Sequence, residues 1–260
     1  MECLHMSGAG NDFMVIDARG QEDTLDFSKM AVELCAKTGA DGFMAVGYSD
    51  SADFRLHFYN SDGSRGEMCG NGARCICRLA YEWGLAGDSM VMETDAGPVP
   101  CWRVSESIYR VQLNLPSVLD LHRTNEAAYV ELGNPGIPHC VVEMPGLTWQ
   151  MREHLRQTAK ALCHHPAFPK GANVNLFCPL DDSTARLLTY ERGVEDYTLA
   201  CGTGSASTAL TLWAQGRLPH GRLTVQNPGG DLDICVESAE GRITALFLEG
   251  PTEIVKIMEL

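Results

Sequence analysis

Two short stretches of this sequence place a cysteine directly before a glycine-rich turn. One reads CGNGARC, from Cys69 to Cys75, and the other reads CGTGSAS, from Cys201 to Ser207. Apolar residues at helical spacing follow each stretch, so we expect each leading cysteine at the N-terminus of a helix. Exposed N–H groups and the helix dipole lower the pKa of a thiol there and favour the thiolate. Because glycine lets a ligand approach the backbone closely, the same N–H groups can bind a carboxylate.

A facing pair of such thiols suits inversion at a carbon atom that carries a carboxylate. One thiolate removes the α-proton from one face, and the opposing thiol returns a proton to the other face. The ordinary pKa of cysteine, about 8.5, makes both protonation states accessible near neutral pH. Helix N-termini directed at the carboxylate would stabilise the charge of the forming carbanion. We therefore interpret Cys69 and Cys201 as a candidate acid/base pair.

The two halves of the chain carry similar features in the same order. Each half has a Gly-Asn pair ahead of a β-prone run, in GAGNDFMVID and in GNPGIPHCVV. Each then has a strand that ends in tyrosine, and Cys69 follows Asn60 at the same spacing at which Cys201 follows Arg192. This order indicates two copies of one structural unit. If the copies face one another, the two cysteines flank a cleft between domains, where small-molecule sites are common.

Strand signals outnumber helical ones, which predicts an α+β fold rather than alternating βαβ units. Turn signals in NLPSVLDLHRTNE, residues 114–126, indicate the crossing between an N-terminal domain, 1–117, and a C-terminal domain, 118–249. Helices are predicted at 26–37, 70–84, 148–162 and 202–215. Strands are predicted at 13–18, 42–49, 54–59, 89–94, 109–115, 127–132, 139–144, 185–190, 222–226, 232–237 and 243–250.

Composition limits the classes of protein to which the chain can belong. With 45% hydrophobic and 21% charged residues it is typical of a soluble globular protein. A net charge of −14 argues against a nucleic-acid partner or an anionic membrane surface. Neither a secretory signal nor an apolar run long enough to span a bilayer is visible, so we expect a cytoplasmic protein. The 11 cysteines follow no disulfide framework, and most are expected to be buried apolar residues.

Other uses of the cysteines find less support. Cys69, Cys75 and Cys77 have a spacing that is not typical of zinc ligands, and no C-x-x-C redox motif occurs. Neither GAGNDF nor CGNGAR completes a nucleotide-binding pattern. A cysteine hydrolase with His139 as its base stays open, as does a non-catalytic amino-acid-binding protein or a thiol redox protein.

Six motifs along the chain together resemble the diaminopimelate epimerase family, whose members are cofactor-independent amino-acid epimerases. They are GAGNDFMVID, YNSDGSRGEMCGNGARC, GNP with PHCVV, NVNLF, YERGV and ACGTGSA. The resemblance implies two pseudo-symmetric domains, each a mainly antiparallel sheet wrapped around a central helix, with residues about 250–260 crossing back to the first domain. It also implies a homodimer that acts on a small-molecule amino acid, LL-diaminopimelate, to give the meso form for lysine and peptidoglycan synthesis. No cofactor and no metal are expected.

The same resemblance assigns roles to individual residues. It implies that Cys69 and Cys201 are the acid/base pair. The N–H groups of Gly70, Asn71, Gly202 and Thr203 would hold the carboxylate at the reacting carbon. Asn11, Asn60, Asn134, Asn173 and Arg192 would bind the far end of the substrate, with Glu191 near the amino group.

Two departures from the family pattern concern the substrate rather than the reaction. The family's GNPH is longer here, reading Gly133 to His139, and Tyr197 stands before Thr198 where the family commonly has glutamate. The link from Arg192 to Cys201 is also longer by one residue. A racemase of another amino acid, such as histidine, that uses the same cysteine pair is therefore the alternative hypothesis.

Overall fold

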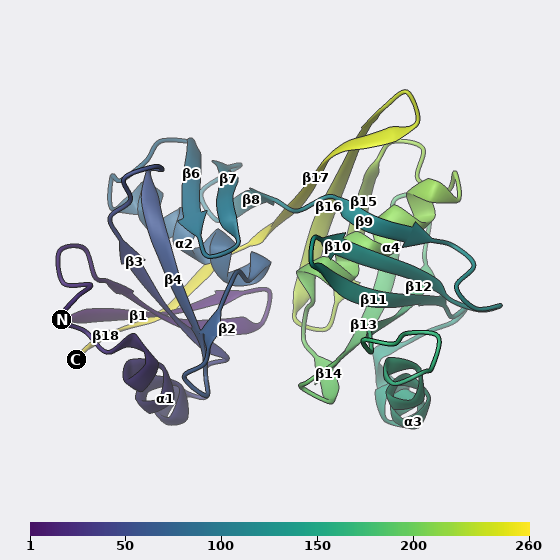
Figure 1. Ribbon diagram of the computed structural model, residues 1–260, viewed down its shortest axis with the longest axis horizontal. Helices are drawn as coiled ribbons and strands as arrows, with labels where there is room; N and C mark the ends of the chain where they lie inside the picture. The colour runs from purple at the N-terminus through teal and green to yellow at the C-terminus, as the bar shows by residue number, and fades with distance from the viewer. The chain divides into compact units, whose positions relative to one another are not determined.

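The structure is a computed structural model that describes residues 1–260, and its contacts divide the chain into two units (Figure 1). The first unit comprises Met1–Gln112 together with Glu249–Leu260, and the second comprises Leu113–Leu248. The sequence had placed the boundary at residues 117 and 118. Strand β17 (Arg242–Pro251) runs through the second boundary between the units.

The first unit is a curled sheet with one helix inside it and one outside. Its helices are α1 (Phe27–Thr38) and α2 (Gly70–Glu82). Its strands are β1 (Glu2–Gly8), β2 (Asn11–Asp17), β3 (Gly42–Gly47), β4 (Phe54–Asn60), β5 (Arg65–Gly66), β6 (Ser89–Thr94), β7 (Gly97–Arg103), β8 (Ile108–Gln112) and β18 (Glu253–Glu259). They pair in the order β18, β1, β2, β3, β4, β6, β7 and β8, with β5 beside β4. Only the β2–β3 and β4–β6 pairs are parallel.

The second unit repeats this plan. Its helices are α3 (Arg152–Cys163), preceded by a 3₁₀ turn at Trp149–Met151, and α4 (Gly202–Ala214). Its strands are β9 (Pro116–Asp120), β10 (Ala128–Gly133), β11 (Gly136–Glu143), β12 (Asn173–Pro179), β13 (Thr184–Glu191), β14 (Asp196–Thr198), β15 (Arg222–Asn227) and β16 (Gly230–Ala239). They pair in the order β9, β10, β11, β12, β13, β15 and β16, with β14 beside β13. The β11–β12 and β13–β15 pairs are parallel, as at the corresponding places in the first unit.

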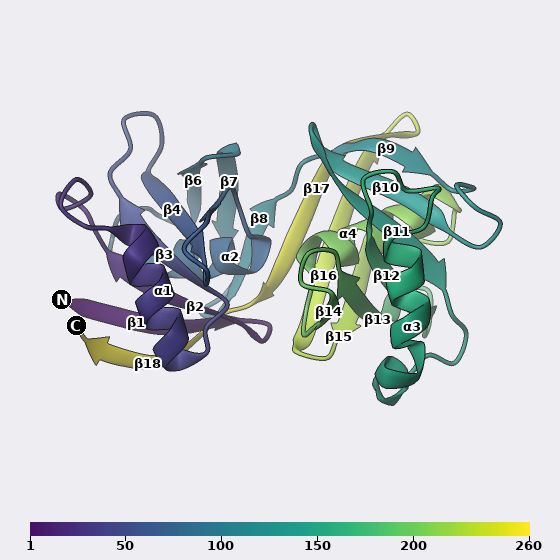
Figure 2. The ribbon, with the colours of Figure 1, turned by 60° about the horizontal axis from the view of Figure 1, so that its bottom comes forward.

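The predicted α+β fold with two similar, mainly antiparallel units is confirmed. Each sheet curls around one central helix, because α2 contacts β1 and β2 as well as β7 and β8, and α4 contacts β10, β11, β12 and β16. The other two helices lie on the outside of their sheets, α1 against β2, β3 and β4, and α3 against β12 and β13 (Figure 2). All four helices predicted from periodicity exist at nearly the predicted bounds.

Small residues let the central helices approach their sheets closely. A Cβ atom on Gly8 of β1 would lie 2.7 Å from the carbonyl oxygen of Asn71 in α2, so only glycine fits there. In α4 the buried Ser207, Thr208 and Thr211 hydroxyls donate to backbone carbonyls one turn earlier, at 2.8–3.0 Å. These bonds satisfy the hydroxyls without a partner outside the helix, which allows a polar sequence to occupy the core.

The segment 114–126, predicted as the crossing between domains, contains a strand that the sequence analysis did not predict. Residues Pro116–Asp120 form β9, which pairs antiparallel with β10. A proline at the start of an edge strand is compatible with pairing, because its missing N–H faces no partner. The turn signals describe only the residues that follow β9.

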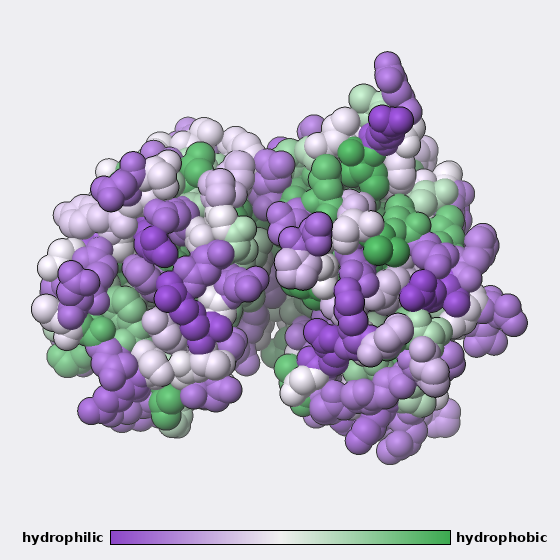
Figure 3. All heavy atoms as spheres, in the orientation of Figure 1, coloured by the Kyte–Doolittle hydropathy of each residue, from purple (hydrophilic) through white to green (hydrophobic).

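The surface is mostly hydrophilic on the face shown in Figure 3, in keeping with the charge of −14. No helix of the structure is long and apolar enough to cross a bilayer. None of the 11 cysteines forms a disulfide.

Candidate functional site

Cys69 lies at the N-cap of α2, as the sequence predicted. Its backbone is extended, with φ −130° and ψ 118°, and Gly70 begins the helix. The thiol is partly exposed and lies 3.6 Å from the Oδ1 atom of Asn11, to which it can donate. Because the first N–H groups of a helix have no carbonyl one turn earlier, those of Gly70 and Asn71 are suited to an anion beside this thiol.

Asn11 and Asn60 lie at the ends of two strands of the same sheet, β2 and β4, between which β3 lies. Asn11 begins β2, and its amide donates to the Asp41 carboxylate at 2.6 Å. Asn60 ends β4, and its amide donates to the Ser64 hydroxyl at 2.9 Å. The structure therefore brings Asn11 to Cys69 directly, whereas Asn60 is exposed and bonded within its own turn.

One residue of α2 that the sequence analysis did not select lies close to this turn. Arg74 is fully buried, and its Nη1 atom donates to the Gly70 carbonyl at 3.2 Å and to Asn71 Oδ1 at 3.0 Å. Its Nε and Nη2 atoms are buried without any partner. Arginine within a helical CGNGARC run is ordinarily expected on the surface, so its type and spacing gave no signal of this position.

Cys201 occupies the corresponding place at the N-cap of α4. Its backbone angles, φ −122° and ψ 110°, nearly match those of Cys69, and Gly202 begins the helix. The Gly204 N–H donates to its sulfur at 3.3 Å, and the Thr203 hydroxyl lies 3.5 Å from it. Both groups lower the pKa of the Cys201 thiol, as expected for a helix N-terminus.

The net effect on Cys201 is nevertheless the opposite of the prediction. Burial, and after it the charge of Glu191, raise the pKa of the Cys201 thiol well above its usual value. The thiol is only 7% exposed and hydrogen-bonds the Glu191 carboxyl, whose Oε1 atom also accepts from Thr198 Oγ1 at 2.8 Å. In the free protein, Cys201 is therefore a thiol that donates to a carboxylate, and the lowering of its pKa expected at a helix N-terminus is outweighed here.

Asn173 and Arg192 are brought together in the second unit. The Asn173 Oδ1 atom accepts from the Arg192 backbone N–H at 2.9 Å. The Arg192 guanidinium is exposed and donates through Nη1 to the Lys170 carbonyl. The loops 61–64 and 192–195 are equally long, so Glu191, rather than Arg192, is the counterpart of Asn60 at the end of its strand. Between these strand ends and the cysteines, the second unit has one residue more than the first, because β14 has 3 residues and β5 has 2.

His139 is buried on β11 and bonded to Asn175 of β12. The Asn175 amide lies 3.1 Å from His139 Nδ1 and also donates to the Cys140 carbonyl at 3.2 Å, while Thr189 donates to its oxygen at 3.1 Å. The His139 Nε2 atom has no partner. Burial, and after it the charge of Arg192, lower the pKa of His139 to about 3, so the imidazole is neutral.

The two departures noted in the sequence have different structural outcomes. Asn134 and Pro135 form the exposed turn between β10 and β11, and a cis peptide bond joins them. In the first unit, Asn11 is the first residue after the equivalent turn rather than part of it. Tyr197 is buried in an apolar cluster against the Tyr190 ring, with centroids 5.5 Å apart. Burial raises the pKa of Tyr197 to about 12. Its side chain is thus part of the core of the second unit.

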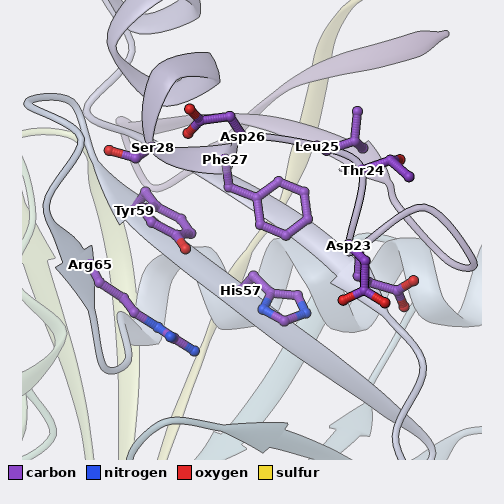
Figure 4. Close-up of a pocket in the computed structure, with 10 residues that line it drawn as sticks. Asp23, Thr24, Leu25, Asp26, Phe27, Ser28, His57, Tyr59 and Arg65 are labelled. Carbon is purple, nitrogen blue, oxygen red and sulfur yellow. The ribbon is translucent and has the colours of Figure 1, made fainter.

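A surface pocket of about 570 Å³ in the first unit contains none of the predicted site residues (Figure 4). It lies between the start of α1 and strand β4, where the Phe27 ring stands 5.2 Å from the His57 ring. Burial, followed by the charges of Arg55 and Arg65, lowers the pKa of His57. The pocket combines a neutral imidazole with Asp23, Asp26 and Arg65, and the Ser28 hydroxyl in it donates to the Gly63 carbonyl at 2.8 Å.

One group of three side chains has the composition of a metal site. Ligand atoms of Cys163, His164 and Glu195 lie within 4.8 Å of one another. His164 and Glu195 form an exposed ion pair at 2.9 Å, and the Cys163 thiol belongs to the apolar core of the second unit. Burial, and after it the charge of Glu195, raise the pKa of Cys163, which keeps it a thiol. An ion pair beside a core cysteine accounts for this group.

Comparison with known proteins covers nearly the whole chain. The sequence model of the family described as diaminopimelate epimerase matches residues 3–108 and 132–255. A diaminopimelate epimerase of Aquifex aeolicus is 33% identical over 277 residues, which are 100% of this chain and 96% of that protein. A diaminopimelate epimerase of Flavobacterium psychrophilum is 31% identical over 258 residues, 98% of each chain.

Solved structures share the fold at low sequence identity. A phenazine biosynthesis protein of the PhzF family from Bacillus anthracis superposes with a TM-score of 0.75 at 17% identity, covering 100% of this chain and 98% of that one. A hydroxyproline epimerase from Agrobacterium vitis, with bound trans-4-hydroxy-L-proline, gives 0.71 at 17% identity, covering 100% and 90%. These likenesses concern the architecture of two sheets around two helices.

Proposed function

Because the chain belongs to the diaminopimelate epimerase family, we propose that it interconverts LL-diaminopimelate and meso-diaminopimelate without a cofactor, for lysine and peptidoglycan synthesis. One observation carries the proposal beyond the family. Each unit holds a cysteine at the N-cap of its central helix, with nearly the same backbone angles. Two such thiols supply the base and the acid that inversion at one carbon requires.

In the proposed reaction, the α-carbon of the substrate lies between the sulfur atoms of Cys69 and Cys201. One sulfur, as thiolate, takes the α-proton and becomes a thiol, and the electron pair of the broken C–H bond stays on the substrate. The other thiol gives its proton to the opposite face and becomes a thiolate. The configuration at the α-carbon inverts. The net charge of the protein is unchanged, but the negative charge now lies on the other sulfur. The reverse reaction therefore uses the same two groups in exchanged roles.

The substrate carboxylate is proposed to bind at the two helix N-termini. The N–H groups of Gly70, Asn71, Gly202 and Thr203 lie in the first turns of α2 and α4. As the α-proton leaves, negative charge spreads onto this carboxylate, and donors already in place stabilise it without reorganisation. Such donors are most effective in a site from which water is excluded.

Glu191 is proposed to serve Cys201 as well as the amino group of the substrate. Its carboxyl accepts from the Cys201 thiol, and Thr198 holds it in position. In the direction in which Cys201 is the base, it starts as the thiolate left when it gave its proton to the substrate. The Glu191 carboxylate accepts again from the thiol that forms when Cys201 takes the α-proton. Asn11, Asn60, Asn134, Asn173 and Arg192 remain the proposed contacts of the far end of the substrate.

The experiment follows deuterium incorporation at the α-carbon of LL-diaminopimelate incubated with reduced protein in deuterated water. Exchange and formation of the meso isomer are expected. The Cys178→Ala variant should retain this exchange, because Cys178 is a buried cysteine on β12 outside the site. The proposal would be refuted if no exchange occurred in protein whose Cys69 and Cys201 thiols had been shown to be reduced.

A panel of L-amino acids, including histidine, tests the substrate against the alternative racemase. Separation of enantiomers by chiral chromatography measures each conversion. The proposal requires diaminopimelate to be turned over faster than every other member of the panel. The homodimer implied by the family is tested separately by light scattering, where a mass near 28.3 kDa would indicate a monomer instead.

A further inference from the structure

The central helices differ at one fully buried position that follows each cysteine at the same distance. In α2 this position is Arg74, and in α4 it is Ala206. Both side chains are 0% exposed. A buried guanidinium in one copy and a methyl group in the other is the largest chemical difference between the two first turns.

Arg74 is a buried cation without a carboxylate partner. Its two hydrogen bonds go to neutral acceptors, the Gly70 carbonyl and the Asn71 side chain, and Nε and Nη2 have none. Burial lowers the pKa of Arg74 to about 10, so it stays protonated at neutral pH. A buried charge without a counter-charge costs several kcal/mol, so an anion near Arg74 would be strongly favoured.

Three thiols are the groups whose negative charge would raise the pKa of Arg74 and so stabilise its protonated form: Cys75, Cys69 and Cys77. Burial raises the pKa of Cys75 to about 12 and that of Cys77 well above the usual value. Both therefore remain thiols at neutral pH. Cys69 is the partly exposed one of the three, and it caps the helix whose first carbonyl accepts from Arg74. Its 3.6 Å contact with the Asn11 Oδ1 atom favours the thiol, so the charge of Arg74 must outweigh this contact.

Most other charges on the elements that pack against α2 have their own partners. Asp17 of β2 pairs with Arg19 at 2.6 Å, whereas Glu2 of β1 is exposed. On β1 and β2, His5 lies 3.1 Å from the Asp12 carboxylate. At the far end of α2, Arg78 pairs with Glu82 at 2.7 Å, Arg103 of β7 pairs with Asp88, and Arg110 of β8 pairs with Glu249. Glu67, just before Cys69, is exposed. No charged residue other than Arg74 lies in the first five positions of α2.

The surroundings of Cys201 carry the opposite charge. There the Glu191 carboxyl accepts from the thiol, and no cation occupies the position of Arg74. An adjacent cation favours a thiolate, whereas an adjacent carboxylate favours a thiol. The two thiols are therefore inequivalent before any substrate binds.

We propose that Arg74 makes Cys69 the resting thiolate of the pair, while Glu191 keeps Cys201 the resting thiol. Arg74 is a positioning residue, since it acts through Cys69 and through the Gly70–Asn71 turn. The inference rests on the proposed two-thiol function and deepens it. It implies that the free enzyme is poised to remove the proton of the stereoisomer that presents its α-hydrogen to Cys69.

The test measures how pH governs alkylation of each cysteine in the substrate-free, full-length protein. Iodoacetamide is added over a range of pH, and mass spectrometry of digested peptides gives the rate at Cys69 and at Cys201. The pH midpoint is the readout, because absolute rates also follow exposure. We expect the midpoint of Cys69 to lie at least about one pH unit below that of Cys201, which is about tenfold in thiolate fraction. Equal or reversed midpoints would overturn the proposal whatever the variants do.

Variants separate the charge of Arg74 from its packing. Arg74→Met should raise the Cys69 midpoint and lower its alkylation rate at pH 7 by about tenfold, and Arg74→Lys should restore much of both. The matched control is Arg78→Met, one turn further along α2, which should leave the midpoint unchanged. An unchanged midpoint in a folded Arg74→Met protein would exclude the role of Arg74. These measurements use no substrate, so they succeed or fail independently of the diaminopimelate assay.

Discussion

The first turns of α2 and α4 have nearly the same backbone and opposite electrostatics. Cys69 and Cys201 cap their helices with φ and ψ that agree within about 10°, and each precedes a Gly-x-Gly turn. A buried arginine lies behind one thiol, and a carboxylate accepts a hydrogen bond from the other. Duplication thus preserved the backbone that presents the thiol, while the charges around it diverged.

Under the proposed two-thiol mechanism, this difference means that a symmetric reaction does not need symmetric groups. Inversion would require one base and one acid, and the substrate alone would have to set different protonation states on two identical thiols. The proposed fixed charges set those states before the substrate binds. Substitutions of the thiols, of a buried histidine, of two glycines and of a helix cap should affect the two units differently. They are given in decreasing order of expected effect.

Removing either thiol should have the largest effect. Cys69→Ala and Cys201→Ala should each lower turnover by about 10²–10⁴-fold, the usual loss on removal of an acid or base. Chiral chromatography of the diaminopimelate products measures this loss in both directions. Full activity in either variant would contradict the two-base mechanism, and Cys178→Ala, in a buried cysteine outside the site, should keep normal turnover.

The stability of the second unit in acid should depend on His139. The corresponding residue in the hairpin of the first unit is Met14, which cannot titrate. The pKa of His139 is about 3 in the folded protein and about 6.5 when exposed. The unfolded chain therefore binds a proton below pH 6.5 that the folded chain does not, and stability falls from about pH 6.5 toward pH 3. The slope from this one group approaches about 1.4 kcal/mol per pH unit.

Urea unfolding at several pH values measures this slope. His139→Gln should flatten it, even if the variant is less stable at pH 7. His220→Gln changes an exposed histidine and should leave the slope unaltered. The same slope in His139→Gln as in the parent protein would show that other groups control acid unfolding.

The second glycine of each turn should tolerate alanine to different extents. A Cβ on Gly204 would lie 2.2 Å from the Asn175 Oδ1 atom, which is fixed in a buried hydrogen-bond network, so overpacking should cost about 1–3 kcal/mol. A Cβ on Gly72 would meet the end of the Met44 side chain, which can change rotamer. Denaturant unfolding should find Gly204→Ala the less stable variant, and the reverse order would place the tighter packing around α2.

The smallest effect is expected at the outer helices. The Asp26 side chain caps α1 by accepting from the Lys29 N–H at 3.0 Å, whereas Thr148, before the turn that leads into α3, makes no such bond. Asp26→Ala should cost about 1 kcal/mol of unfolding free energy, and Thr148→Ala much less. Equal losses would mean that the cap contributes nothing beyond the change of side chain.

The sequence was sufficient for the features that depend on local spacing. Glycine-rich turns before apolar runs placed Cys69 and Cys201 at helix N-termini, and recurrence of the same order revealed the two units. Asn173 and Arg192 were selected together and are hydrogen-bonded. These predictions rest on periodicity and turn chemistry, which act over a few residues.

Features that depend on the tertiary surroundings could not be predicted in this way. The charge and spacing of Arg74 indicate an exposed residue, and its burial follows from the sheet that curls around α2. Likewise, the helix dipole at Cys201 was recognisable, but the burial and the Glu191 contact that outweigh it were not. Tyr197 was noted as a departure from the family pattern, and the packing of its ring in the core of the second unit could not be foreseen from that. In each case, residues distant in sequence determine the burial and the contacts of the side chain.

Strand β18, at the C-terminal end of the chain, pairs with β1 at the N-terminal end, so one sheet contains both ends of the chain. In the second unit the hairpin β10–β11 is flanked by β9, which precedes it in sequence, whereas in the first unit the same place beside β1 is taken by the last strand of the chain. The Leu260 N–H donates to the Met1 carbonyl at 2.9 Å, so the two ends are adjacent (Figure 1). A protein synthesised from the N-terminus can therefore close the first sheet only after the second has been made. A circular permutant that begins at Glu249 and joins the old termini would make each unit continuous and remove that delay.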